Sequence, residues 1–121
     1  MTATTLAPRQ KPERKIELRV ERRPDFLRVA IRGEASYDQA EVLSAELLRI
    51  SHDGSSLVVL DLAGLTSLSS LAMGALIEYR RGVARRGVEV RLANVQPQVW
   101  LALELAGLGR LFERIDLEEP T

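Results

Sequence analysis

The segment LVVLDL, residues 57–62, constrains the fold of this chain more than any other stretch. Five of its six residues are apolar, and no alternation with polar residues marks a face turned to water. Strands with this pattern are covered on both faces, as the central strands of parallel sheets are. We therefore predict an α/β fold in which this strand lies inside the sheet.

The rest of the chain alternates between strand and helix patterns. Residues 16–21 and 26–33 interleave apolar with charged side chains and predict an antiparallel hairpin. Helical spacing begins at Ser36, at Ser70 and at Pro97, with Gly87 ending the second helix, and further strands are predicted at 88–95 and 111–115. The expected order is β-β-α-β-α-β-α-β, in a mixed sheet of four to five strands covered by helices.

Length and composition exclude several classes of protein. The 121 residues fit one domain, which we place at 15–115 between a solvated tail at 1–14 and an acidic tail at 116–121. Seventeen basic and seventeen acidic residues cancel, so no net positive field attracts nucleic acid. The lack of cysteine and the single histidine argue against a disulfide framework and against the common zinc sites.

Neither a membrane span nor a nucleotide-binding loop is predicted. The longest uncharged stretch, residues 62–77, is too short and too polar to cross a bilayer, and residues 1–15 lack the apolar core of a secretory signal. No glycine-rich phosphate loop of a known kind is present. We therefore expect a cytoplasmic protein that needs no cofactor and does not insert into a membrane.

The junction after the central strand carries four hydroxyl side chains and no charge. These are Thr66, Ser67, Ser69 and Ser70. The first N–H groups of a helix favour a negative charge, yet no acidic residue occurs between positions 66 and 77. A phosphate on a capping serine would supply that charge and would repel an acidic or closely packed partner. Alternatively, these residues are simply preferred helix caps.

Three loops are predicted to meet at one edge of the sheet, because the carboxyl ends of parallel strands share an edge. They are residues 33–37, 65–70 and 94–98. Such an edge usually carries the function of an open α/β sheet. We expect the hydroxyl-rich junction to lie there.

Other residues have structural interpretations. Asp61 is a lone carboxylate in a buried strand, which favours a structural hydrogen bond over catalysis. His52 follows a helix and would complement its carboxyl end. Gly74 and Gly82 share one helix, where each costs about 1 kcal/mol relative to alanine, so we expect them to allow close packing against the sheet.

Several motifs resemble the STAS domain, the fold of bacterial anti-sigma-factor antagonists and of sulfate-transporter tails. SSLAMG at 69–74 falls on the family's Asp-Ser-Ser-Gly-Leu-Gly motif, Asn94 on its strand-end asparagine, and GLGRLFERI at 107–115 on its closing signature. Gly33 and Glu34 fall on its Gly-Glu-Leu-Asp stretch, with Ser36 at the aspartate. The resemblance covers residues 15–115 and implies the STAS fold.

The chain departs from the family at the motif that such domains phosphorylate. Leu71 occupies the position of the usual acceptor serine, Ser69 replaces the leading acid, and Ala72 replaces the first glycine. Ser70 and Gly74 keep the family's identities. The resemblance therefore implies Ser70 as the phosphate acceptor, with Ser69 as the second candidate.

In that family an unphosphorylated domain binds a histidine-kinase-like anti-sigma factor, which phosphorylates the serine and is thereby released. The resemblance implies that this chain is not an enzyme but the partner of such a kinase. Expected contact residues are Gly33, Glu34, Ser36, Ser69, Ser70, Leu71, Ala72, Met73 and Asn94. The alternatives are a scaffold or transporter accessory subunit that does not switch, and a site for a small anion or lipid headgroup. The sequence leaves the oligomeric state open.

Overall fold

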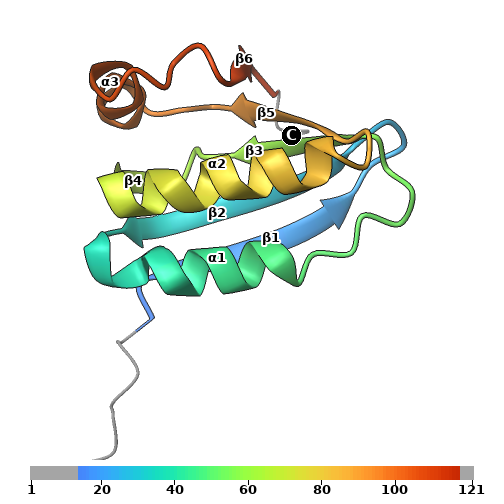
Figure 1. The fold of residues 1–121 in the computed structure, drawn as a ribbon, viewed down its shortest axis with the longest axis horizontal. Helices are drawn as coiled ribbons and strands as arrows, with labels where there is room; N and C mark the ends of the chain where they lie inside the picture. Colours follow the sequence, from blue (N-terminus) through green and yellow to red (C-terminus); the bar gives the residue numbers. More distant parts are fainter. Residues whose placement is uncertain (1–13, 118–121) are drawn as a thin grey trace, which may run out of the picture.

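A computed structural model describes residues 14–117, so most of both predicted tails lies outside the described residues. Its strands are β1 (Ile16–Arg22), β2 (Leu27–Ala35), β3 (Leu57–Asp61), β4 (Leu65–Leu68), β5 (Glu89–Ala93) and β6 (Glu113–Ile115). Its helices are the short 3-10 helix η1 (Tyr37–Gln39), α1 (Ala40–Leu48), α2 (Ser70–Ala84) and α3 (Pro97–Leu105). Figure 1 shows α1 and α2 side by side in front of the sheet.

The sheet has the order β1-β2-β3-β5-β6, with β4 beside the second half of β2. The β1–β2 hairpin is antiparallel, and the other pairings are parallel. The predicted α/β fold, the hairpin and the central position of the LVVLDL strand are confirmed. Val58, Val59 and Leu60 in β3 are completely buried. On the face of Val59, its register neighbours Arg28 and Arg91 are only partly exposed, so arginine side chains help to shield this strand.

Strand β4 was not predicted, and it raises the described sheet to six strands instead of four to five. The sequence of residues 65–68 indicates a loop, because its two apolar residues are separated by two polar ones. In the structure Leu65 and Leu68 are buried, while Thr66 and Ser67 between them are exposed. A four-residue strand with this pattern gives no clear alternation. Its pairing with β2 also includes a register irregularity after Gly33.

Helix α2 buries its apolar stripe in the core and ends where the sequence indicated. Gly87 has a φ of +77°, in the left-handed region that glycine favours. Its N–H donates to Ala84 O at 3.0 Å, and Val88 N donates to Val83 O at 3.0 Å. These two bonds form a Schellman motif, which satisfies carbonyls at the helix end.

The prediction for the two glycines inside α2 was wrong. A Cβ atom built at Gly74 or at Gly82 would meet no other group within 4 Å. Neither glycine is therefore required for close packing against the sheet. Both remain weak points in the helix, since glycine costs conformational entropy there.

The substitution Gly82→Ala is expected to stabilise the protein by about 1 kcal/mol, because residue 82 is exposed and its helix gains propensity without a clash. Urea unfolding followed by circular dichroism would measure the change. Gly87→Ala is the matched control and should destabilise the fold, because φ at that position is +77°. A loss of stability in Gly82→Ala would contradict the open environment seen for this residue.

His52 pairs with a tyrosine of α2 and not with the helix before it. Its Nε2 lies 2.7 Å from the hydroxyl of Tyr79, and the two rings stack with centroids 5.9 Å apart. Burial, assisted by Arg86, lowers the pKa of His52, whereas burial raises the pKa of Tyr79 to about 12. A helix carboxyl end would instead raise a histidine pKa, so the predicted dipole contact is not the dominant influence. A neutral His52 therefore shares a hydrogen bond with the Tyr79 hydroxyl through Nε2.

Stability is expected to fall as the pH drops below about 6.5, the ordinary pKa of histidine. The unfolded chain binds a proton there while folded His52 resists it, so protons favour unfolding until the lowered folded pKa is passed. The chain has one histidine. His52→Asn should therefore remove this loss of stability from a plot of unfolding free energy against pH between about 7.5 and 5.5, roughly one pH unit on either side of the ordinary histidine pKa. An unchanged profile in His52→Asn would contradict the assignment.

Candidate functional site: the tip of helix α2

The three predicted loop segments meet at one edge of the sheet, as expected. Ser69 N donates to Ala35 O at 2.9 Å, and Thr66 Oγ1 donates to Gly33 O at 3.1 Å. From the third segment, Gln98 Nε2 donates to Thr66 O at 3.4 Å. Side-chain and backbone hydrogen bonds therefore hold the end of β2, strand β4 and the start of α3 together around the beginning of α2.

Ser69 is the N-cap of α2, as one interpretation of the hydroxyl-rich junction predicted. Its backbone is extended, with φ −73° and ψ 161°, and its Oγ accepts a hydrogen bond from Ala72 N at 3.2 Å. The side chain is half-buried. The Ser69 hydroxyl is thus already engaged in holding the helix start.

Ser70, the first residue of α2, is exposed, and its side chain makes no hydrogen bond to the described part of the chain. The first turn of α2 contains no acidic residue. By position, the N–H groups of Ser70 and Leu71 have no partner within the helix. Ser70 is therefore the hydroxyl at this tip that is open to solvent and next to free donors.

The next three residues divide between surface and core. Leu71 is 48% exposed, which is unusual for a large apolar side chain on a helix that is otherwise well packed. Ala72 and Met73 are buried, at 0% and 5% exposure, and belong to the apolar core. The structure therefore does not place Ala72 and Met73 on the surface expected for them, since the helical period turns both toward the sheet.

The end of β2 adds acidic groups beside this tip. Glu34 is exposed and pairs in register with Ser67 of β4. Ser36 was predicted to cap the first helix, but it precedes η1, and its Oγ donates to Asp38 Oδ1 at 2.6 Å. That hydrogen bond is the main cause that lowers the pKa of Asp38. The tip that lacks acids in sequence thus has Glu34 and Asp38 on neighbouring elements.

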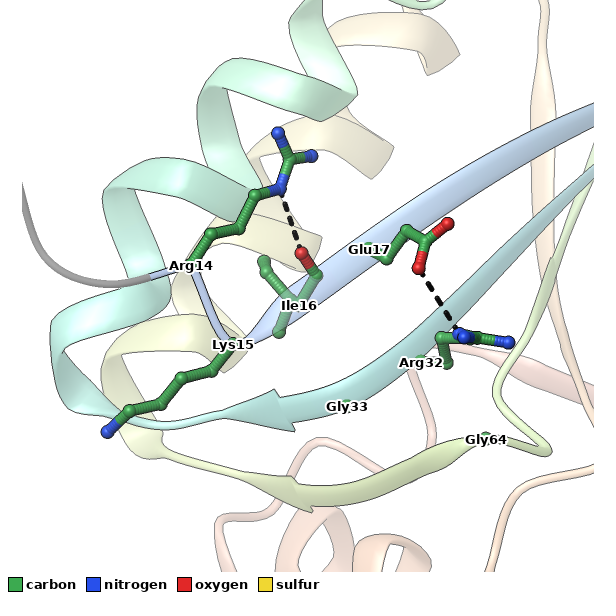
Figure 2. Close-up of a pocket in the computed structure, with 7 residues that line it drawn as sticks. All are labelled: Arg14, Lys15, Ile16, Glu17, Arg32, Gly33 and Gly64. Atoms are coloured by element: carbon green, nitrogen blue, oxygen red, sulfur yellow. Dashed lines mark hydrogen bonds and ion pairs between the residues drawn. The ribbon is translucent and has the colours of Figure 1, made fainter.

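Gly33 has a structural explanation. Its φ is +104°, and a Cβ at this position would lie 2.0 Å from Lys15 O. It lines an open hollow of about 740 Å³ with Arg14, Lys15, Arg32 and others, shown in Figure 2. Glycine is required here because the backbone of β1 approaches too closely for a side chain.

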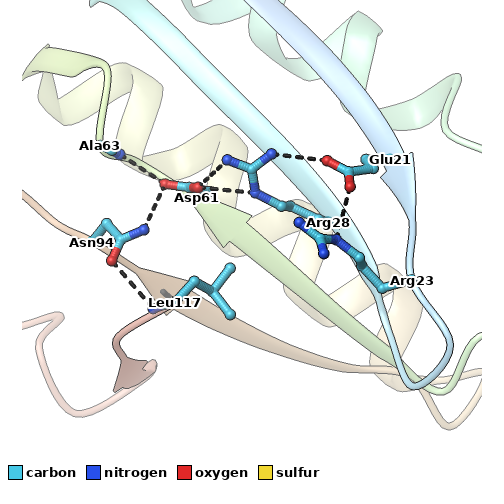
Figure 3. A network of polar contacts seen from close by, with 7 residues as sticks. All are labelled: Glu21, Arg23, Arg28, Asp61, Ala63, Asn94 and Leu117. Carbon is cyan, nitrogen blue, oxygen red and sulfur yellow. Dashed lines mark hydrogen bonds and ion pairs between the residues drawn. The ribbon is translucent and has the colours of Figure 1, made fainter. Parts of the chain in front are cut away.

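Asp61 anchors a buried polar network, shown in Figure 3. Its side chain is 2% exposed, and its Oδ2 accepts from Arg28 Nη2 at 2.6 Å and from Arg28 Nε at 3.0 Å. Its Oδ1 accepts from Ala63 N at 3.0 Å and from Asn94 Nδ2 at 3.2 Å. Arg28 Nη1 also donates to Glu21 Oε2 at 3.0 Å. The structural hydrogen bonding predicted for Asp61 is confirmed.

Asn94, which directly follows β5, belongs to this network. Its φ is +55°, a conformation that asparagine tolerates better than most residues. Its Oδ1 accepts from Leu117 N at 3.2 Å, so the side chain ties Asp61 to the segment after β6. The contacts of Asn94 explain its presence without a partner protein.

We define the helix-tip surface as the exposed or half-exposed side chains at the start of α2 and at the neighbouring ends of β2 and β4. They are Glu34, Ser36, Ser67, Ser70 and Leu71. Among residues 14–117, no group of three side chains could hold a metal ion. Over the same residues, no helix is long and apolar enough to cross a membrane. This surface offers three serine hydroxyls, a leucine and a carboxylate, a composition suited to contact with another protein.

A comparison of the sequence with family models decides the classification. The model of the STAS domain matches residues 17–120, which is most of the chain. The chain belongs to the STAS domain family. No curated protein matches this STAS domain in sequence.

Solved structures share the fold of this STAS domain. An anti-sigma factor antagonist from Mycobacterium paratuberculosis superposes with a TM-score of 0.71 at 20% identity, covering 82% of this chain and 84% of that chain. The anti-sigma factor antagonist SpoIIAA in its unphosphorylated form gives 0.66 at 17% identity, with coverages of 85% and 90%. A sulfate transporter family protein from Wolinella succinogenes gives 0.62 at 20% identity, with coverages of 74% and 72%. At these identities the likeness concerns the fold.

Proposed function

We propose that this STAS domain acts in the cytoplasm as an anti-sigma-factor antagonist, a regulator of transcription and not an enzyme. In this proposal it binds a kinase-type anti-sigma factor and thereby frees a sigma factor. The observation that carries the proposal is the exposure of Ser70 beside exposed Leu71 at the start of α2. The fold shared with anti-sigma factor antagonists supports it.

Leu71 is the apolar anchor of the proposed interface. Leu71 is 48% exposed, and removing such apolar surface from water on binding favours a complex. Glu34, Ser36 and Ser67 would form the polar rim around it. Ala72 and Met73 would act indirectly, because their packing against the core fixes the orientation of the helix.

Phosphorylation of Ser70 would release the partner. A phosphate there adds nearly two negative charges next to the unpartnered N–H groups of the first turn, which stabilise it within this domain. The same charges would stand beside Leu71 and near the acidic groups of η1 and β2, and would oppose a closely packed partner. Ser69 is the weaker candidate acceptor, because its oxygen already caps the helix.

One feature favours a second candidate function, that of a scaffold which does not switch. Leu71 occupies the position at which the STAS motif carries its acceptor serine, and a leucine side chain cannot accept a phosphate. If Ser70 is not modified either, the exposed leucine would make the surface constitutively ready to bind. Such a domain would serve in a signalling assembly or as an accessory subunit of a transporter.

The docking surface can be tested with histidine-kinase-like anti-sigma factors from the same genome by isothermal titration calorimetry. Leu71→Glu should weaken binding at least about thirtyfold, because truncating a central apolar anchor and adding a charge costs more than 2 kcal/mol. The matched control is Leu105→Glu on α3, since Leu105 is 80% exposed and is the last residue of its helix, at the opposite end from Gln98. Equal affinities for the two variants would contradict the assigned surface.

A further inference from the structure

Strand β1 forms an open edge of the sheet. It stands first in the strand order, is seven residues long and contains no proline. In the part of the chain that the structure describes, no strand pairs with its outer side. Such an edge presents unpaired N–H and C=O groups and can accept another strand.

The inner hydrogen bonds of β1 show which residues face β2. Glu34 N donates to Lys15 O at 3.1 Å, and beyond the other end of the strand Arg23 N donates to Phe26 O at 2.9 Å. Bonded and non-bonded pairs alternate along an antiparallel ladder. Since the register is continuous between these two bonds, the odd-numbered residues of β1 direct their backbone groups toward β2.

The even-numbered residues Ile16, Leu18 and Val20 therefore direct their backbone groups outward. A bond from outside agrees with this, because Arg14 Nε donates to Ile16 O at 2.9 Å. The side chains of these three residues lie on the face of the sheet that carries the core, yet Val20 is 47% exposed. The edge thus combines free ladder groups with an apolar side chain that nothing covers.

We propose that β1 pairs antiparallel with β1 of a second copy of this chain, about a two-fold axis at Leu18. This register places Leu18 opposite Leu18 of the second copy and Ile16 opposite its Val20. On the other face it places Glu17 opposite Arg19 of the second copy. Each contact occurs twice by symmetry, so apolar side chains meet on one face and opposite charges on the other.

Neighbouring registers are less complementary. Moving the axis to Arg19 sets Arg19 against its own copy and Glu17 against Glu21, which are pairs of like charge. Moving it to Val20 keeps Arg19 opposite Glu21 but sets the apolar Leu18 against the charged Arg22. Sequence pairing therefore selects the axis at Leu18, since a strand register is specified by the pattern of its side chains.

The flank of the edge also offers apolar surface to a second copy. Leu48, at the end of α1, is 78% exposed, and α1 packs next to β1. An open groove of about 380 Å³ runs between these elements, lined by Leu18, Val20 and Ile50 among others. In the paired state the bond from Arg14 to Ile16 O would be exchanged for one from Val20 N of the second copy. This inference does not depend on the proposed function.

The charge pairing gives a test by light scattering of the full chain after size exclusion. The wild type should be a dimer. Arg19→Glu alone and Glu17→Arg alone should each shift toward monomer, with at least about tenfold weaker dimerisation, because each sets like charges opposite each other twice. An equimolar mixture of the two variants should regain the dimer, since every cross pair is then opposite in charge.

Thermal unfolding of each variant verifies that it is folded, which is expected because Arg19 and Glu17 are exposed at 76% and 52% of their side-chain surface. Leu71→Glu is the control that should leave the dimer unchanged, because it lies outside the edge. A wild type that stays monomeric at millimolar concentration would overturn the proposal. So would a mixture that stays monomeric, or variants that dimerise alone as well as the wild type.

Discussion

Replacing Asp61 with alanine is expected to destabilise the protein by about 3 kcal/mol, the lower end of the range for breaking a buried ion pair. The change would remove the carboxylate oxygen that accepts from both Nε and Nη2 of Arg28, whose side chain is 15% exposed. It would also remove the acceptor of Ala63 N and Asn94 Nδ2. Chemical denaturation monitored by circular dichroism would measure the loss.

Two further variants separate this pair from ordinary surface charges. Glu21→Ala, which removes the outer and more exposed partner of Arg28, should cost less than about 1 kcal/mol. The double variant Arg28→Met with Asp61→Leu should recover much of the loss, because it leaves no unpaired buried charge. If Asp61→Ala cost no more than Glu21→Ala, the buried network would not have the structural role assigned to it.

The substitution Gly33→Ala is expected to cost about 3–5 kcal/mol, or to prevent folding. The added Cβ would stand 2.0 Å from Lys15 O, a backbone atom of the residue just before β1, and φ at this position is +104°. Both the hairpin and its pairing with β4 would have to shift, since Gly33 pairs with Ile16 on one side and Leu65 on the other.

Gly54→Ala is the matched control for Gly33→Ala. Gly54 also has a positive φ, of +81°, but a Cβ there would meet nothing within 4 Å. Gly54→Ala should lower the free energy of unfolding only by the conformational cost of a positive φ in alanine, about 1 kcal/mol. The difference between the two melting temperatures isolates the close approach of β1. Similar values for both variants would contradict the contact between Gly33 and Lys15.

The pattern of apolar residues was sufficient to predict the central strand, the hairpin and the three main helices. Each has a pattern of apolar residues that burial imposes on the sequence, as in the continuous apolar run of β3, where Val58, Val59 and Leu60 are fully buried. Strand β4 could not be predicted, because its pairing with β2 depends on an irregular register and buries only two of its residues. The local pattern of apolar residues does not show which strand a short segment such as β4 will pair with.

The candidate site was predicted in part. The spacing of hydroxyl residues located the tip of α2, and Ser69 caps it as the preference of serine indicates. Which neighbours are exposed depends on how α2 is rotated against the sheet, so Ala72 and Met73 were assigned to the surface although they are buried. The Arg28–Asp61 pair joins residues 33 positions apart, and nothing in the local sequence connects them.

The central claim is that a partner docks on the helix-tip surface and that a charge on Ser70 evicts it. The most direct measurement is size exclusion of the complex with a kinase-type anti-sigma factor before and after addition of ATP, with mass spectrometry of this chain. We predict that the wild type gains one phosphate, on Ser70, and leaves the complex, whereas Ser70→Ala stays unmodified and bound. A complex that persists after phosphorylation, or equal labelling of Ser70→Ala, would contradict the account.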